Sequence, residues 1–234
     1  MPGLFALAGG DEFRPAYRKP DQALLALLPP DLGPIVIVPT AAAHEGPEQA
    51  VGNGSHHFFN LAPDIPITGA LVVDTAKAND KRLVQRIASA GIVYLTGGNP
   101  WYLVETLRGS AALEALQTVL QRGGIVAGSS AGAMALCQWM RKRGGGWQEG
   151  LNLIPGIAVL PHHGDQPEAL EATRAGLPVE VIALGIPTGV TCVSLPREDA
   201  SNKRSQWRVL GARPVTIYRA TEAKQVREGE MFSL

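Results

Sequence analysis

One short stretch, Val126-Ala127-Gly128-Ser129-Ser130-Ala131-Gly132-Ala133, decides how the rest of the sequence is interpreted. It contains a Gly-x-Ser-x-Gly pattern centred on Ser130. Residues 124–127 predict a strand and residues 131–140 predict a helix, so Ser130 falls in the turn that joins them. This context is typical of a nucleophile elbow, in which flanking glycines permit a strained backbone and the amide of Ala131 can face a developing oxyanion. The alternative is a tight turn in which Ser130 only caps its helix.

Strand-like and helix-like segments alternate through the first two-thirds of the chain. The strand-like runs are short, apolar and mostly rich in valine and isoleucine, which suits parallel strands covered on both faces. The alternation predicts an α/β fold with a doubly wound, mostly parallel sheet. The expected strands are Leu4–Ala8, Ile35–Val38, Ala70–Val73, Ile92–Leu95 and Ile125–Ala127, and the expected helices are Asp21–Leu28, Asn79–Ala90 and Ser110–Arg122.

The last third of the sequence has short apolar runs separated by turn-rich segments and no long helix. This pattern predicts C-terminal antiparallel hairpins added to the edge of the sheet. The runs are Val181–Leu184, Val190–Leu195, Trp207–Leu210 and Val215–Tyr218. Neither an internal repeat nor a long linker divides the chain, so we expect a single domain over residues 1–234.

The composition excludes several classes of partner. The formal net charge is zero and 18% of residues are charged, which gives no basic face for nucleic acid. No apolar stretch approaches the ~18 residues of a membrane span, and the N-terminus lacks the positive region of a signal peptide, so we expect a cytoplasmic protein that binds no membrane. Cys137 and Cys192, in an expected helix and strand, are interpreted as buried free thiols. The histidines and acids show no metal-ligand spacing, so we expect neither a metal nor an organic cofactor.

A serine nucleophile needs a base, and only His162 and His163 follow the elbow. Both follow the apolar run Gly156–Leu160 after one intervening proline, at a strand end where sites assemble in open α/β sheets. A solvated loop doublet is the alternative for this pair. The earlier histidines are interpreted as structural or surface residues; they are His44, His56 and His57. The α/β-hydrolase esterases are disfavoured, because their histidine comes late in the chain.

Three motifs in the same order carry a resemblance to a known family. The first is the elbow at residues 128–133, the second is Thr-Gly-Gly-Asn at residues 96–99, and the third is Gly-Leu-Asn-Leu-Ile-Pro-Gly at residues 150–156, which leads to Leu-Pro-His at residues 160–162. The chain resembles the serine peptidases that include aspartyl dipeptidase (dipeptidase E) and cyanophycinase. Their fold is similar to that of class I glutamine amidotransferases, which themselves need a cysteine where this chain has Ser130.

The resemblance implies a serine-type peptidase that hydrolyses a dipeptide or small amide through an acyl-enzyme. Ser130 would be the nucleophile and His162 its general base. The backbone amides of Gly98 and Ala131 would stabilise the oxyanion, and Asn99 would lie at the mouth of the pocket. The partner would be a small peptide or amide substrate, and a homodimer is left open.

The sequence departs from the family pattern at the third member of the triad. Thr188 stands where the resemblance implies a glutamate that orients the histidine. Glu149, the only acid between Ser130 and His162, is the first substitute, and Asp165 is the second. Residues 164–176 contain a single arginine where aspartyl peptidases of the family have several, so strict aspartyl specificity is not expected. A non-catalytic relative that binds a small ligand or a partner is the alternative.

Overall fold

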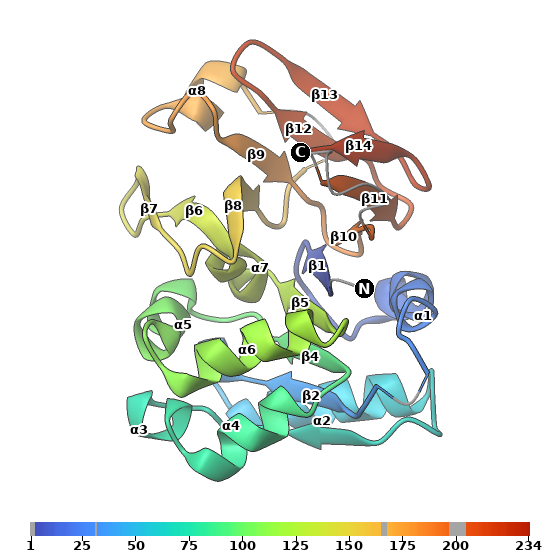
Figure 1. Ribbon diagram of the computed structural model, residues 1–234. Helices are drawn as coiled ribbons and strands as arrows, with labels where there is room; N and C mark the ends of the chain where they lie inside the picture. Colours follow the sequence, from blue (N-terminus) through green and yellow to red (C-terminus); the bar gives the residue numbers. More distant parts are fainter. Residues whose placement is uncertain (1–2, 31, 165–167, 197–204) are drawn as a thin grey trace.

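The computed structural model describes residues 3–30, 32–164, 168–196 and 205–234. These residues form two sheets joined by the segment that follows the elbow (Figure 1). The first sheet has eight strands: β1 (Leu4–Ala8), β2 (Ile35–Val38), β3 (Ile67–Gly69), β4 (Ile92–Leu95), β5 (Ile125–Ser129), β10 (Thr191–Ser194), β11 (Gln206–Leu210) and β14 (Met231–Ser233). The second has six: β6 (Cys137–Arg141), β7 (Trp147–Glu149), β8 (Ile154–Leu160), β9 (Ile182–Gly185), β12 (Val215–Tyr218) and β13 (Ala223–Val226).

The first sheet has the order β14-β11-β10-β1-β5-β4-β2-β3, so β5 lies at its centre between β1 and β4. Strands β1 to β5 pair in parallel, and the register sets Ala8 opposite Ser129 and Leu95 opposite Gly128. The carboxyl ends of three neighbouring strands therefore meet where the elbow begins. Ligand sites form at this edge of open parallel sheets.

Helices cover both faces of the parallel strands. They are α1 (Arg18–Leu25), α2 (Pro47–Phe59), α3 (Thr75–Ala78), α4 (Lys81–Ala88), α5 (Pro100–Leu107) and α6 (Ala111–Gln121). Val93 packs with Ile87 of α4 and Leu116 of α6, whereas Ile92 packs with Leu24 of α1 and Phe58 of α2. Successive strand residues point to opposite faces, so burial on both sides explains why these strands are apolar without alternation.

The C-terminal third differs from the prediction in one respect. Strands β10, β11 and β14 extend the first sheet in antiparallel fashion beyond β1, as expected of hairpins at its edge. Strands β9, β12 and β13 instead join the second sheet, whose order is β13-β12-β9-β8-β6-β7. Within it β8 pairs in parallel with both β6 and β9. The short helix α8 (Leu170–Arg174) lies beside β12.

Two local predictions were wrong, and one helix was not predicted. The elbow helix α7 (Ala131–Leu136) ends early and Cys137 begins a strand, because the amides of residues 151 and 153 donate to the carbonyls of Ala135 and Leu136. The third strand occupies Ile67–Gly69 rather than residues 70–73. The glycine-containing segment around His56 is helix α2, and Gly54 suits its buried face because a Cβ there would press against Ile37.

No helix within the described ranges has the length and apolar character needed to cross a membrane.

Candidate active site

Ser130 occupies a strained turn between β5 and α7. Its backbone has φ 47° and ψ −107°, a conformation that L-residues rarely adopt. A Cβ at Gly128 would overlap the backbone of Gly132, and a Cβ at Gly132 would overlap the backbone of Leu95. The Ser130 amide donates to the Ala8 carbonyl at 3.0 Å. Both glycines of the motif are therefore needed for close backbone packing, and the geometry is that of a nucleophile elbow.

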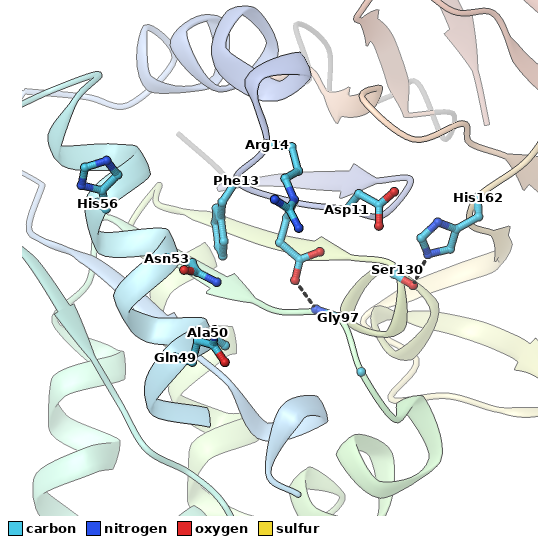
Figure 2. A pocket seen from close by; sticks show the side chains of 12 residues that line it. Asp11, Phe13, Arg14, Gln49, Ala50, Asn53, His56, Gly97, Ser130 and His162 are labelled. Carbon is cyan, nitrogen blue, oxygen red and sulfur yellow. Dashed lines mark hydrogen bonds between the residues drawn. The ribbon is translucent and has the colours of Figure 1, made fainter. Parts of the chain in front are cut away.

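His162 lies two residues beyond the end of β8, and its imidazole reaches Ser130. The distance between Ser130 Oγ and His162 Nε2 is 3.1 Å (Figure 2). The ring packs directly on Gly10, where any Cβ would overlap it. His162 also has a positive φ, 52°, and its amide donates to the Gly9 carbonyl at 2.7 Å. The predicted nucleophile and base thus meet at hydrogen-bond distance.

Ser130 and His162 follow strands of different sheets, and both are hydrogen-bonded to the end of β1. Ser130 follows β5 of the first sheet, and His162 follows β8 of the second. Their backbone amides donate to the consecutive carbonyls of Ala8 and Gly9 at the end of β1. A short clip of backbone therefore fixes the relative position of the candidate nucleophile and base.

The second ring nitrogen of His162 faces Thr188. The distance between His162 Nδ1 and Thr188 Oγ1 is 3.3 Å. The structure does not bring Glu149 to this place, because Glu149 ends strand β7 and its exposed carboxylate lies 3.9 Å from Arg108. Asp165, the other substitute, lies outside the described residues. The threonine therefore occupies the position at which the family resemblance implied an acid.

The backbone amides of Gly98 and Ala131, which the family resemblance assigns to the oxyanion, have no hydrogen-bond partner among the described residues. The turn that carries Gly98 lies close to the elbow, since a Cβ at Gly97 would be 3.5 Å from Ser130 Cβ. Gly98 has φ 131° and its α-carbon faces the Ala41 carbonyl so closely that no side chain fits. Free amides at this place can donate to an oxygen that develops negative charge.

Asn99 has a structural role in the described part of the chain. Its side chain accepts a hydrogen bond from the Tyr102 amide at 3.0 Å and so caps helix α5. Its own amide donates to the Ala41 carbonyl at 2.7 Å. Gly98 lines the pocket, and Asn99 is not among the lining residues.

A pocket of about 610 Å³ opens in front of Ser130 and His162. Three groups of residues line the rest of it: the loop after β1, one face of α2, and the turn after β4. Their members are Asp11, Glu12, Phe13 and Arg14, then Gln49, Ala50, Asn53 and His56, then Gly97 and Gly98 (Figure 2). Sequence reasoning missed the first two groups. The Gly9-Gly10 pair at the end of the first strand was the available signal for the loop.

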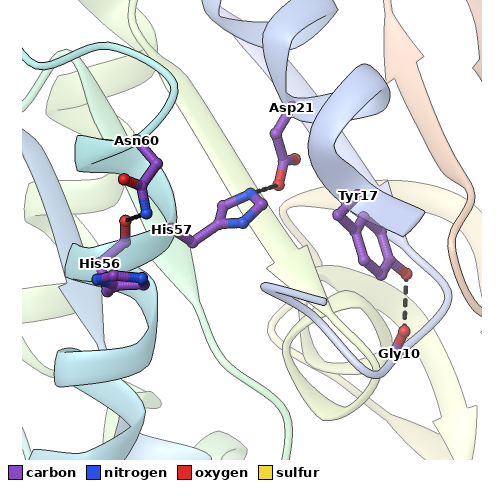
Figure 3. Close-up of polar contacts among 6 residues, drawn as sticks. All are labelled: Gly10, Tyr17, Asp21, His56, His57 and Asn60. Atoms are coloured by element: carbon purple, nitrogen blue, oxygen red, sulfur yellow. Dashed lines mark hydrogen bonds and ion pairs between the residues drawn. The ribbon is translucent and has the colours of Figure 1, made fainter. Parts of the chain in front are cut away.

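His56 and His57 divide between the pocket and the core. His56 is exposed at the pocket, whereas His57 is buried and lies 2.7 Å from the carboxylate of Asp21 (Figure 3). Burial raises the pKa of Asp21, and the hydrogen bond with His57 opposes that rise. Phe13, which lines the pocket, packs against the His57 ring with centroids 5.7 Å apart, so the Asp21–His57 pair supports this part of the pocket wall.

His163 is also buried, and its Nε2 lies 2.8 Å from the Tyr218 hydroxyl. Its neighbour His162 is therefore the histidine of the doublet that faces the pocket. Cys137 and Cys192 are buried free thiols, and burial raises the pKa of both. Within the described ranges no three histidine, cysteine or acidic side chains gather in a way that could hold a metal ion.

Comparison with known proteins gives consistent results. The model of peptidase family S51 matches residues 4–183. The solved structure of a peptidase from an acI-B1 Actinobacterium is similar over 100% of this chain and 98% of its own, with a TM-score of 0.82 and 26% identity. A candidate peptidase E from Listeria monocytogenes EGD-e covers 97% of this chain and 99% of its own, with a TM-score of 0.54 and 15% identity, which supports the fold alone. No curated protein sequence matches.

Proposed function

The chain belongs to peptidase family S51, and on that premise we propose that it hydrolyses a dipeptide or another small amide through an acyl-enzyme formed on Ser130. Family membership makes it a serine peptidase in general terms. One observation carries the specific proposal. Ser130 Oγ and His162 Nε2 are 3.1 Å apart, within the range in which an imidazole can take a proton from a serine hydroxyl.

The reaction begins when Ser130 Oγ attacks the scissile carbonyl while His162 Nε2 takes its proton. The amides of Gly98 and Ala131 donate to the oxyanion of the tetrahedral intermediate. His162 then protonates the leaving amine, and the acyl-enzyme remains. Water attacks the ester with His162 as base, and Ser130 regains its proton as the product acid leaves.

Thr188 orients His162 in this scheme. With Nε2 unprotonated, Nδ1 carries the proton and donates to Thr188 Oγ1, which selects the tautomer that catalysis requires. A hydroxyl fixes the ring but supplies no charge to stabilise the imidazolium, unlike the carboxylate of a Ser-His-Asp triad. We therefore expect slower turnover than in relatives with an acid at this position.

The pocket lining supports a substrate without an acidic side chain. Asp11 and Glu12 contribute two carboxylates against the single guanidinium of Arg14. An aspartyl side chain would meet net negative charge here, and like charges at close range repel. We propose that neutral or cationic residues are preferred on the acyl side of the scissile bond.

A serine-directed fluorophosphonate followed by peptide mapping tests the proposal. We expect a label on Ser130 in the wild-type protein, no label in Ser130→Ala, and an undiminished label in Ser55→Ala, a control on α2 whose serine does not line the pocket. A panel of dipeptides with acidic, neutral and basic first residues should then identify the preferred substrate. A folded protein that is neither labelled nor active on any dipeptide contradicts the proposal.

The second candidate is a non-catalytic relative that binds a small ligand, and Thr188 in place of an acid favours it. Thermal-shift measurements with dipeptides and their hydrolysis products distinguish the two. Stabilisation by product-like ligands without any turnover or labelling supports the binding protein.

A further inference from the structure

Glu12 joins the two segments that carry the free amides of the site. Its Oε1 accepts a hydrogen bond from the Gly97 amide at 2.6 Å, and its Oε2 accepts one from the Ser129 hydroxyl at 2.8 Å. Gly97 belongs to the turn after β4, whereas Ser129 is the last residue of β5. Figure 2 shows the hydrogen bond between this carboxylate and Gly97.

The bond to Gly97 anchors one side of Gly98. The other side is anchored by Asn99, whose amide donates to the Ala41 carbonyl at 2.7 Å. The Gly98 amide, which has no partner of its own among the described residues, is therefore held between two fixed peptide groups. Glycine has the greatest backbone freedom of any residue, so a free Gly-Gly turn would otherwise sample many directions for this N–H.

The second hydrogen bond of Glu12, with the Ser129 hydroxyl, anchors the start of the elbow. Ser129 is fully buried and directly precedes Ser130. The Ala131 amide belongs to the residue that follows Ser130. A single carboxylate thus contacts both the strand end that presents Ala131 and the turn that presents Gly98. Its two oxygens match the two donors one to one.

We propose that Glu12 is a positioning residue that aligns the Gly98 and Ala131 amides on the oxyanion, an inference that rests on the proposed function. Glu12 acts through Gly97 and Ser129 and contacts neither the scissile carbonyl nor the leaving group. The arrangement makes the donors rigid before the reaction, which is how preorganised amides stabilise an oxyanion without reorganising at the moment of reaction.

Two substitutions separate geometry from charge. Glu12→Ala removes both acceptors. Glu12→Gln keeps an acceptor oxygen for Gly97 and offers an amide N–H to the Ser129 hydroxyl, which can rotate to accept it. Ser129→Ala removes only the second contact. Glu105→Ala on the exposed face of α5 is the matched control, since it deletes the same side chain away from the pocket.

Steady-state kinetics on the best dipeptide should show a split between kcat and KM. We expect Glu12→Ala to lower kcat by about 10–100-fold with KM within about threefold, because misaligned oxyanion donors weaken the transition state and not ground-state binding. Glu12→Gln should restore kcat to within about threefold of wild type, and Ser129→Ala should fall between them, about 3–10-fold lower. Glu105→Ala should match the wild type.

Nuclear magnetic resonance of the uniformly ¹⁵N-labelled protein adds a measurement that needs no substrate. We expect the Gly97 amide proton to resonate downfield and exchange slowly in the wild type and in Glu12→Gln, and to lose both properties in Glu12→Ala. This result stands even if no substrate is found, so it separates the failure of this inference from the failure of the proposed function.

Two outcomes overturn the inference. If Glu12→Ala and Glu12→Gln both raise KM and leave kcat unchanged, Glu12 binds a cationic group of the substrate instead. If Glu12→Ala is folded and turns over like the wild type, or its Gly97 amide is unaltered, the carboxylate positions nothing.

Discussion

The two sheets contribute to the site in different ways. The first sheet presents Ser130 and Gly98 from the ends of adjacent strands, and close backbone packing at glycine positions fixes both. The second sheet presents His162 from the end of β8, and the loop after β9 adds Thr188. Backbone packing at glycines therefore fixes the nucleophile half. The base half depends in addition on the side-chain contacts of the His162 ring with Ser130 and Thr188. This difference predicts which changes the site tolerates.

The largest effect should come from removing the side chain of either the nucleophile or the base. We expect Ser130→Ala and His162→Ala each to lower kcat by about 10⁴–10⁶-fold, and the double variant to be no worse than the single ones, because the pair acts as one unit. Rate measurements on the best dipeptide, with circular dichroism to verify folding, provide the check. Losses that add across the double variant would show that the two sheets act independently.

A methyl group added at Gly10, where the His162 ring packs, should have the next largest effect. Gly10→Ala would push the His162 ring away from Ser130, because a Cβ there overlaps the imidazole. We expect kcat to fall by about 10²-fold, the cost of misplacing a catalytic group by about 1 Å.

Gly109→Ala is the control for this substitution. Gly109 also has a positive φ, 68°, but nothing lies near its absent side chain. Both variants should lose about 1 kcal/mol or more of stability from backbone strain, and only Gly10→Ala should lose activity. Equal activity losses in the two variants would show that strain, and not the contact with His162, is responsible.

The smallest effect concerns the orientation of the base. We expect Thr188→Val to lower kcat about fivefold, since the Nδ1 contact is one neutral hydrogen bond worth about 1 kcal/mol. Thr188→Glu should instead raise kcat by supplying the charge that stabilises the imidazolium. The pH-rate profile of each variant measures the effect.

Glu149→Ala serves as the reference for the Thr188 series. Its carboxylate is exposed beside Arg108, and exposed ion pairs contribute little, so kcat should remain within about twofold of the wild type. Loss of activity in Glu149→Ala, together with no change in Thr188→Val, would return the orienting role to the acid.

The parallel strands were predictable because burial on both faces leaves a local signature. Runs such as Ile35–Val38 and Ile92–Leu95 coincide with β2 and β4 in the structure. Helix α2 was not predictable in the same way. Gly52 and Gly54 weaken helical periodicity, and the helix persists because its buried face packs on the sheet. The second sheet was missed because strand pairing is set by contacts distant in sequence.

The site was predictable where residues are adjacent in the sequence. Ser130 and the turn at Gly97-Gly98 were recognisable from local motifs, and chain order singled out the doublet that contains His162. Glu149 was selected only because it is an acid between the two, and position in the sequence gives no distance in space. The Gly9-Gly10 pair marks the loop that carries Glu12, but the role of Glu12 was not recognisable, since its two partners lie 85 and 117 residues away along the chain.

The clip at Ala8 and Gly9 has a consequence for re-engineering the chain. Neighbouring α-carbons are about 3.8 Å apart across any trans peptide. The consecutive carbonyls of Ala8 and Gly9 therefore hold the two amides that they bind at a fixed spacing. A circular permutant opened between Ala8 and Gly9 would separate these two carbonyls and loosen the position of His162 relative to Ser130. New termini belong in the exposed glycine turn at residues 144–146, where the backbone touches nothing that the reaction needs.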